Sequence, residues 1–213
     1  MYQNVKKGLD LLYLQQILKI VEVILTIVTS LFAALTVGSA FLFSSVLATL
    51  FGVLTGLFGV LLVIAALADF ILGLLGILNA SKDEILYKNA LVWLVIGIVI
   101  TILGFFIKDS GKFIWKLIRS IFDAAEGFCS FMVIYSVINA TVNVAQAIGN
   151  VEVFSLGQQR ANSFKTIYIV AIILKFFAFI PAIGGILDLA GSIIMIVVFV
   201  QYLGFLGKAK MMV

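Results

Sequence analysis

Histidine is absent from this 213-residue sequence, and cysteine and proline occur once each. Without histidine, the chain has neither the commonest general base nor the commonest metal ligand of proteins. The single cysteine, Cys129, excludes an intramolecular disulfide and any zinc or iron–sulfur site held by several thiolates. We therefore expect no metal site and no cofactor.

Charged residues are also scarce. They form 11% of the chain, whereas hydrophobic residues form 64%; an ordinary globular protein is about a quarter charged. The formal net charge is only +4. In a chain with long apolar runs, basic loop residues report membrane orientation rather than nucleic-acid binding, so we expect no nucleic-acid partner.

The longest apolar run covers residues 46–80 and contains a single charged residue, Asp69. As one helix it would be about 52 Å long, whereas the hydrocarbon core of a bilayer is about 30 Å thick. A soluble domain of this size has no use for such a helix. The run therefore indicates an integral membrane protein in the lipid bilayer, whose other segments pack around this one.

The predicted fold class is all-α: a polytopic transmembrane helix bundle, with residues 1–213 as one membrane domain and its spans in hairpins. Polar segments at 79–84 and 151–165 are expected to be loops. Ser81 followed three residues later by Glu84 is the pattern of a capping box for the third span. About six spans are predicted, over residues 17–37, 46–78, 85–107, 126–148, 164–180 and 186–206.

Residues 112–125 have a different pattern, in which apolar and charged positions alternate with helical periodicity around Trp115. This amphipathicity predicts a helix that lies in the membrane interface. A partner-binding helix is the alternative interpretation. Arg119 and Asp123 are spaced for an i,i+4 ion pair on its polar face.

Two acidic residues fall within the first two spans. Glu22 shares a helical face with Lys19 and Thr26, which predicts either an ion pair near the interface or the wall of a polar cavity. Asp69 is solvated at the interface if the second span ends near residue 67. If the span reaches residue 76, Asp69 is embedded and needs a partner or a proton.

The fourth span carries a continuous polar stripe, which Cys129 extends toward its start. Its members are spaced three and four residues apart: Ser136, Asn139, Asn143, Gln146 and Asn150. Buried amides in lipid need partners from neighbouring helices, water or a ligand. The stripe therefore predicts either hydrogen bonds between helices or the wall of a hydrated pathway.

The last two spans contain one charge of each sign. With the turn centred near residue 183, Lys175 should lie level with about residue 191, and Asp188 is one helical turn away. Because an unpaired charge in a membrane is costly, we expect a Lys175–Asp188 ion pair.

Small residues define one face of the second span, where Gly52, Gly56 and Gly59 form a GxxxGxxG pattern. Such faces let helix backbones approach closely. The pattern predicts close packing within the chain or, as the alternative, contact in an oligomer.

Basic residues are distributed unequally over the two sides of a six-span bundle. One side carries Lys108, Lys112, Lys116 and Arg119. The side of both termini carries nine, namely Lys6, Lys7, Lys19, Lys82, Lys88, Arg160, Lys165, Lys208 and Lys210. The positive-inside rule then predicts a multi-pass protein of the cell membrane with both termini in the cytoplasm.

The segment 72–90, LGLLGILNASKDEILYKNA, lies between two spans. This layout resembles small uncharacterised multi-span membrane proteins of bacteria, over most of the chain. The resemblance implies a bacterial membrane protein and brings no catalytic or binding residues.

An enzyme is a poor fit, because neither Asp69 nor Asp188 has a catalytic context and no phosphate-binding loop is present. Short loops and small-residue faces favour a non-catalytic subunit or scaffold that assembles with itself or with other membrane proteins. The alternative is a small-solute or ion transporter or channel. Its pathway residues would be Glu22, Asp69, Asn139, Asn143, Gln146, Lys175 and Asp188.

Overall fold

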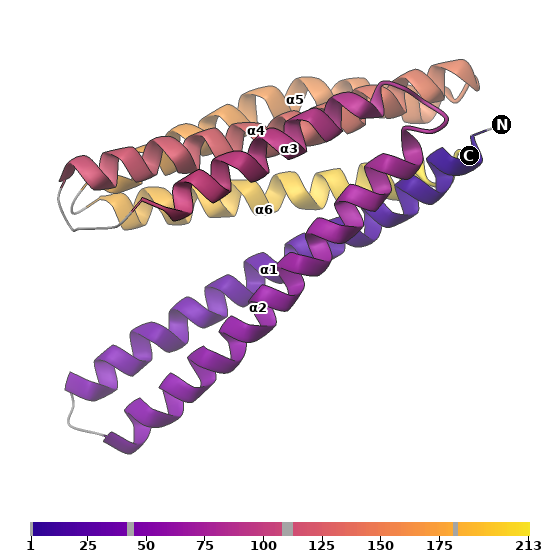
Figure 1. Ribbon diagram of the computed structural model, residues 1–213. Coiled ribbons are helices and arrows are strands. Elements are labelled where there is room, and N and C mark those ends of the chain that lie inside the picture. Colours follow the sequence, from indigo (N-terminus) through magenta and orange to yellow (C-terminus); the bar gives the residue numbers. More distant parts are fainter. Residues whose placement is uncertain (1, 42–44, 108–112, 181–182) are drawn as a thin grey trace. The chain divides into compact units, whose positions relative to one another are not determined.

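The computed structural model describes residues 2–41, 45–107, 113–180 and 183–213, apart from the side chains at 39–41, 105, 178, 185, 188 and 189 (Figure 1). Within these ranges all regular structure is helical, as the sequence predicts. The elements are α1 (Gln3–Phe41), α2 (Ser45–Ala80), α3 (Tyr87–Phe105), α4 (Phe113–Ala147), α5 (Val151–Phe176), the short 3-10 helix η1 (Phe177–Phe179) and α6 (Gly184–Ala209).

Five helical stretches of the described chain are long and apolar enough to cross a membrane. They are Gln3–Gly38, Ser45–Ala80, Tyr87–Gly104, Phe113–Ala147 and Ala190–Ala209. α5 is not among them, since the first half of this helix is rich in polar residues. The chain is therefore membrane-embedded in character, and the number of six spans stays a prediction.

The chain divides into two compact units. The hairpin unit consists of Leu14–Gly73, which is most of α1 and α2. The bundle unit consists of Met1–Tyr13 and Leu74–Val213, and so contains the start of α1, the end of α2 and all later helices.

In the hairpin unit, aromatic rings join the two helices: Phe32 of α1 stacks on Phe51 and Phe58 of α2, with ring centroids 6.1 and 5.5 Å apart. Threonine hydroxyls bond back to the carbonyl four residues earlier, as Thr29 does to Leu25 at 2.7 Å. Such bonds satisfy a hydroxyl without water, which suits an apolar environment.

In the bundle unit, α4 packs against α3 and α5, and α5 packs against α6. The start of α1 and the end of α2 cross closely, since a Cβ atom on Gly8 would lie 2.6 Å from the carbonyl oxygen of Gly76. Only glycine allows backbones to approach so closely. The fully buried side chains come from segments far apart in sequence and include Leu9, Ile77, Tyr87, Val144, Phe164, Tyr168 and Phe205.

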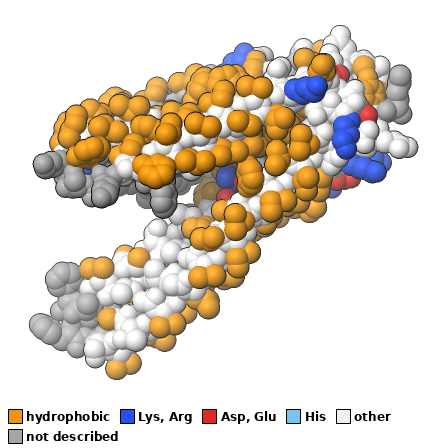
Figure 2. Space-filling view, viewed as in Figure 1, with side chains coloured by type: hydrophobic (Ala, Val, Ile, Leu, Met, Phe, Trp, Pro, Cys, Tyr) orange, Lys and Arg blue, Asp and Glu red, His pale blue; other side chains and the backbone are white. Residues whose placement is uncertain are grey.

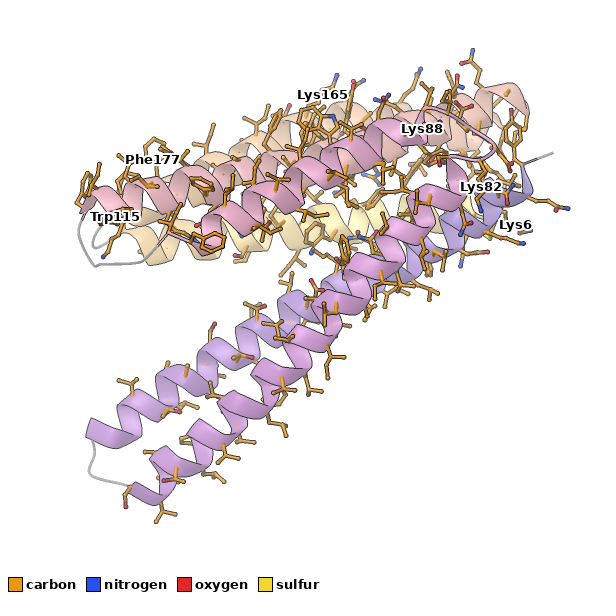
Figure 3. The ribbon with its side chains drawn as sticks, viewed as in Figure 1. Lys6, Lys82, Lys88, Trp115, Lys165 and Phe177 are labelled. Carbon is orange, nitrogen blue, oxygen red and sulfur yellow. The ribbon has the colours of Figure 1, made fainter. Side chains whose placement is uncertain are left out.

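The two ends of the bundle unit differ in character. Both termini lie at one end (Figure 1), where charged side chains gather (Figure 2). Lys6, Lys82 and Lys88 are at this end, whereas Trp115 and Phe177 are at the other (Figure 3). Three of the basic residues that the sequence places on the side of the termini thus lie at this end, and the membrane orientation stays a prediction.

Three sequence-based expectations are wrong. α4 is one continuous helix of 35 residues, so the segment predicted at 112–125 is not a separate helix; residue 112 itself lies outside the described residues. The predicted loop at 151–165 is helical, because Asn150 caps α5 by accepting a hydrogen bond from Val153 N at 3.0 Å. The preceding turn uses Gly149 at φ 74°, where glycine is favoured.

The capping box is the third error. α3 begins at Tyr87, and the Glu84 carboxylate accepts from Leu86 N instead of capping a helix that starts after Ser81. Ser81 Oγ donates backward to the Leu78 carbonyl at 2.9 Å. The hydroxyl therefore closes the end of α2 rather than opening α3.

Candidate functional site

A buried group of charged residues joins the two helices of the hairpin unit. Lys19 Nζ on α1 lies 3.2 Å from Glu22 Oε2 and 3.3 Å from Asp69 Oδ2 of α2. We refer to Lys19, Glu22 and Asp69 as the triad. One ammonium group thus bridges two carboxylates that come from different helices.

Local helix geometry positions the triad. Lys19 and Glu22 are one turn apart on α1, so the predicted ion pair between them is confirmed. Asp69 reaches the same nitrogen because α2 runs back along α1 after a short connection. The sequence left open whether Asp69 is solvated at the interface or embedded with a partner or a proton, and its pairing with a lysine 50 positions away had no local signal.

Burial of the triad is uneven. The Glu22 and Asp69 side chains are only 11% and 10% exposed, whereas the Lys19 side chain is 39% exposed. The long aliphatic part of the Lys19 side chain allows the ammonium to reach the carboxylates while some of the side chain stays at the surface. Asp69 is therefore enclosed by the hairpin and is not a freely solvated carboxylate.

Each carboxylate has one oxygen without a hydrogen bond among the described residues. These atoms, Glu22 Oε1 and Asp69 Oδ1, are buried. The Thr26 hydroxyl donates to the Glu22 backbone carbonyl at 2.8 Å and so is not directed at the carboxylate. The triad thus combines two carboxyl groups with one ammonium group, and each carboxyl group has one oxygen that can still accept a hydrogen bond or bind a proton.

Glycine makes room beside the triad. A Cβ atom on Gly73, one turn after Asp69, would lie 2.7 Å from Gln15 Nε2. The Gln15 amide therefore packs directly against the α2 backbone. The buried Gln16 side chain lies on the adjoining turn of α1.

The polar stripe of α4 does not form one continuous buried surface. Cys129 and Ser136 are buried, whereas Asn139, Asn143 and Gln146 are exposed. Asn143 Nδ2 donates to Glu84 Oε2 at 3.1 Å. The exposed part of the stripe thus reaches the charged end of the bundle unit, where it bonds to the α2–α3 connection.

Lys175 lies where its spacing predicts. A Cβ atom added to Gly191 would lie 3.0 Å from Lys175 Cγ. Lys175 of α5 therefore lies level with residue 191 of α6, as predicted. The side chain of Asp188 lies outside the described residues, and the Lys175–Asp188 pair stays a prediction.

Within the hairpin unit, the glycine pattern of α2 is not used for close helix packing. A Cβ atom on Gly56 or Gly59 would have nothing within 4 Å, and one on Gly52 would meet only Thr36 Cγ2 at 3.9 Å. Close packing at Gly56 and Gly59 is therefore not formed within the hairpin unit, and packing elsewhere or contact in an oligomer stays a prediction. Close crossing occurs instead around Gly8 and Gly76, where the polar ends of both helices meet.

Sequence reasoning missed several hydrogen bonds in the bundle unit. Asp83 accepts from the backbone N–H groups of Asn4 and Val5 at 2.7 and 3.2 Å, and thereby caps the start of α1. Arg160 Nη1 donates to Gln201 Oε1 at 2.9 Å. These partners are 41 to 79 residues apart, so spacing along the chain gave no signal for them.

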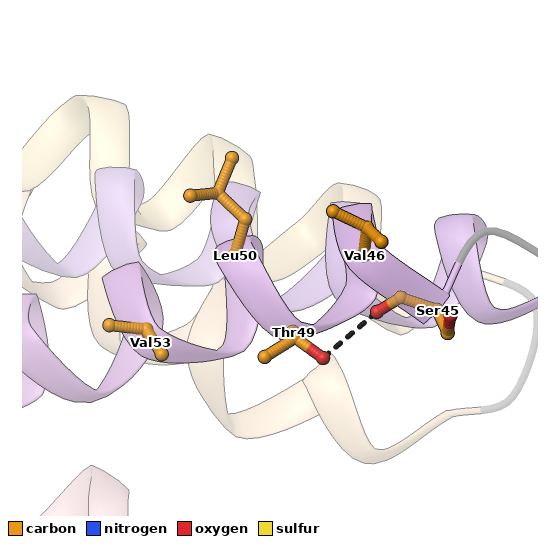
Figure 4. Close-up of a pocket in the computed structure, with 5 residues that line it drawn as sticks. All are labelled: Ser45, Val46, Thr49, Leu50 and Val53. Atoms are coloured by element: carbon orange, nitrogen blue, oxygen red, sulfur yellow. Dashed lines mark hydrogen bonds between the residues drawn. The ribbon is translucent and has the colours of Figure 1, made fainter.

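A shallow depression lies at the start of α2, lined by Ser45, Val46, Thr49, Leu50 and Val53 (Figure 4). The Thr49 hydroxyl already donates to the Ser45 carbonyl at 2.9 Å. The remaining lining is apolar and belongs to one helix, so the depression offers no convergent polar groups for a ligand.

Within the described ranges, no three His, Cys, Asp or Glu residues lie close enough to hold a metal ion. Comparison with protein-family models, curated proteins and solved structures gives no match. The geometry of the chain is thus the basis for inferring its function.

Proposed function

We propose that this chain is a non-catalytic subunit or scaffold of a membrane assembly, in which the hairpin unit contacts a transmembrane helix of another polypeptide. The observation that carries the proposal is the open glycine face of α2. Gly56 and Gly59 have free space beside them. Large apolar side chains elsewhere on α2, such as Val53 and Leu57, are 64% and 56% exposed.

In lipid, exposed apolar side chains need no protein cover, so they do not by themselves indicate a partner. Helices associate in a bilayer by close packing at small residues, because there is little hydrophobic force between them. A glycine face that the hairpin unit itself leaves uncovered therefore favours a helix from outside this unit, and we propose one from another polypeptide. A second copy of this chain and a different membrane protein are both compatible with this role.

The proposed location is the cell membrane of a bacterium, with both termini in the cytoplasm. The charged end of the bundle unit, which carries both termini, supports this orientation (Figure 3). The lysines at this end would then lie at the cytoplasmic surface.

A transporter is the weaker interpretation, because its candidate residues within the bundle unit do not converge. Asn143 bonds to Glu84, whereas Lys175 packs against Gly191. Glu22 and Asp69 are already paired with Lys19 in the hairpin unit. A solute pathway would require these side chains to share one hydrated space.

The test is gentle extraction from native membranes, followed by native mass spectrometry of the particle. We expect a defined oligomer or a stoichiometric membrane partner. Gly56→Leu with Gly59→Leu should abolish it, since the added side chains fill the open face and a Cβ atom at either position meets nothing within 4 Å. Leu57→Trp adds bulk at an exposed neighbouring position off that face and should leave the assembly intact. A wild-type monomer without a partner would contradict the proposal, as would an assembly that the glycine variant leaves unchanged.

A further inference from the structure

We propose that the triad of Lys19, Glu22 and Asp69 is a proton-binding site, at which one of the two carboxyl groups is held protonated. This inference does not depend on the proposed assembly role. It rests on the charge balance, the burial and the unsatisfied oxygens of the hairpin unit.

The charge balance of the hairpin unit is uneven. Lys19, Glu22 and Asp69 are the only charged residues between positions 14 and 73. With both acids ionised and the lysine protonated, the unit has one uncompensated negative charge. Such a charge is costly when it is buried and surrounded by apolar helix. One proton beyond that of the ammonium makes the triad neutral.

The geometry provides a place for that proton. The Glu22 and Asp69 side chains are only 11% and 10% exposed, and each directs one carboxylate oxygen to the ammonium of Lys19. The second oxygen of each, Glu22 Oε1 and Asp69 Oδ1, is buried and has no hydrogen bond among the described residues. Because both acids lie on the same nitrogen, their protonation is coupled, and the bound proton belongs to the pair.

A metal cation fits the triad less well than a proton. Hard cations take six or more oxygen ligands. Here two carboxylate oxygens already face the ammonium, which repels a cation, and the Thr26 hydroxyl donates to a backbone carbonyl. Near the triad, α1 has two further polar side chains, Gln15 and Gln16. Asp69 is the only polar side chain of α2 between positions 56 and 78.

Dicyclohexylcarbodiimide is the probe, because it reacts with protonated carboxyl groups in apolar surroundings and leaves a stable adduct. The full-length protein in lipid nanodiscs would be labelled at several pH values and its peptides examined by mass spectrometry. We expect labelling of Glu22 or Asp69 near neutral pH that decreases as the pH rises. Asp123 and Glu152, exposed carboxylates in ion pairs, are the internal controls.

The variants make a sharper test. Glu22→Gln leaves Lys19 and Asp69 as a balanced pair, so labelling of Asp69 should fall to the level of Asp123. Asp69→Asn should likewise protect Glu22. Lys19→Met removes the ammonium and should increase labelling of both acids.

Three results would overturn the proposal. One is wild-type protein in which neither acid is labelled at any pH. Another is Asp69 labelling that Glu22→Gln leaves undiminished, since burial alone would then account for the reaction. The third is protection by sodium chloride, but not by choline chloride, at constant pH, which would identify a metal cation as the ligand. The first and third need only the wild-type chain, so they hold if a variant fails to fold.

Discussion

The hydroxyl of Tyr87 on α3 lies 2.8 Å from that of Thr141 on α4, and both residues are fully buried. The single proton of the Thr141 hydroxyl is already donated to the Val137 carbonyl at 2.7 Å. Tyr87 is therefore the donor of the bond between the helices, and Thr141 accepts it. This direction decides which of the two substitutions leaves a buried group unsatisfied.

Thr141→Val should destabilise the protein more than Tyr87→Phe. The valine leaves a buried tyrosine hydroxyl without an acceptor, at a cost of about 1–3 kcal/mol in the free energy of unfolding. The phenylalanine removes only the donor and leaves Thr141 bonded to Val137, at a cost of about 1 kcal/mol or less. Denaturant titration in one detergent measures both.

Thr141→Ser is the matched control for this pair, because it keeps the hydroxyl and loses only the methyl group. Its bond with Tyr87 should persist. If Tyr87→Phe proved as destabilising as Thr141→Val, the assigned direction of the hydrogen bond would be wrong.

Gly8→Ala should strongly weaken the crossing of α1 and α2. The new Cβ would lie 2.6 Å from the Gly76 carbonyl oxygen and 2.7 Å from the Ala80 Cβ, and neither backbone can move aside alone. Overpacking of this kind costs about 1–3 kcal/mol. Thermal unfolding should therefore show a clear loss of stability.

Gly56→Ala is the comparison, since its Cβ meets nothing within 4 Å. We expect a change in stability of less than about 0.5 kcal/mol. Equal effects of the two alanines would mean that the close contact at Gly8 is not formed in the membrane-embedded protein.

The sequence predicted the helices well and their ends less well. Apolar runs identify α2 and α3 directly, because lipid selects for uninterrupted hydrophobic stretches. α5 was predicted to start near residue 164 and begins at Val151. Its first half is polar and was read as a loop, although a helix with one buried side, carrying Val153, Gly157 and Ala161, tolerates polar residues elsewhere.

The candidate site was predictable only where partners are close in sequence. Lys19–Glu22 and Arg119–Asp123 follow from helical spacing, and both are formed. The pairing of Lys19 with Asp69 depends on how α1 and α2 are aligned, which the sequence does not specify. The role of the glycines stays a prediction for the same reason: GxxxGxxG shows a face of small residues but not what covers it.

Acidic pH should release the start of α1 from the α2–α3 connection. The hydrogen bond from the Asn4 side chain to Asp83, at 2.8 Å, and those from the backbone N–H groups of Asn4 and Val5 hold the pKa of Asp83 below its ordinary value. The stabilisation is then fully present above the ordinary pKa of about 3.9. It is lost as the pH falls through the lowered pKa of the folded protein.

Amide hydrogen exchange at Val5 and the stability difference between wild type and Asp83→Asn, both followed against pH, measure this effect. The difference should be constant near neutral pH and shrink below about pH 4. Asp10→Asn removes an exposed carboxylate near the same end and should not alter the dependence. A difference that grew on acidification would have the wrong sign for a lowered pKa.

The depth of the first half of α4 in the membrane can be read from the Arg119–Asp123 pair. Arg119 Nε lies 3.1 Å from Asp123 Oδ1, the two side chains are 54% and 46% exposed, and Arg119 Nη1 also donates to the Gly104 carbonyl. An interfacial location, as the sequence predicts, makes the pair weak because water and salt screen it. Asp123→Asn should then cost less than about 0.5 kcal/mol in the free energy of unfolding. Arg119→Gln should cost more, since the Gly104 carbonyl in the last turn of α3 then also loses its donor.

In hydrocarbon the same Asp123→Asn change would leave an unpaired arginine and cost several times as much, about 3–5 kcal/mol. Denaturant titration of both variants in lipid bicelles distinguishes the two locations, and the larger cost for Asp123→Asn would show that this part of α4 spans the bilayer.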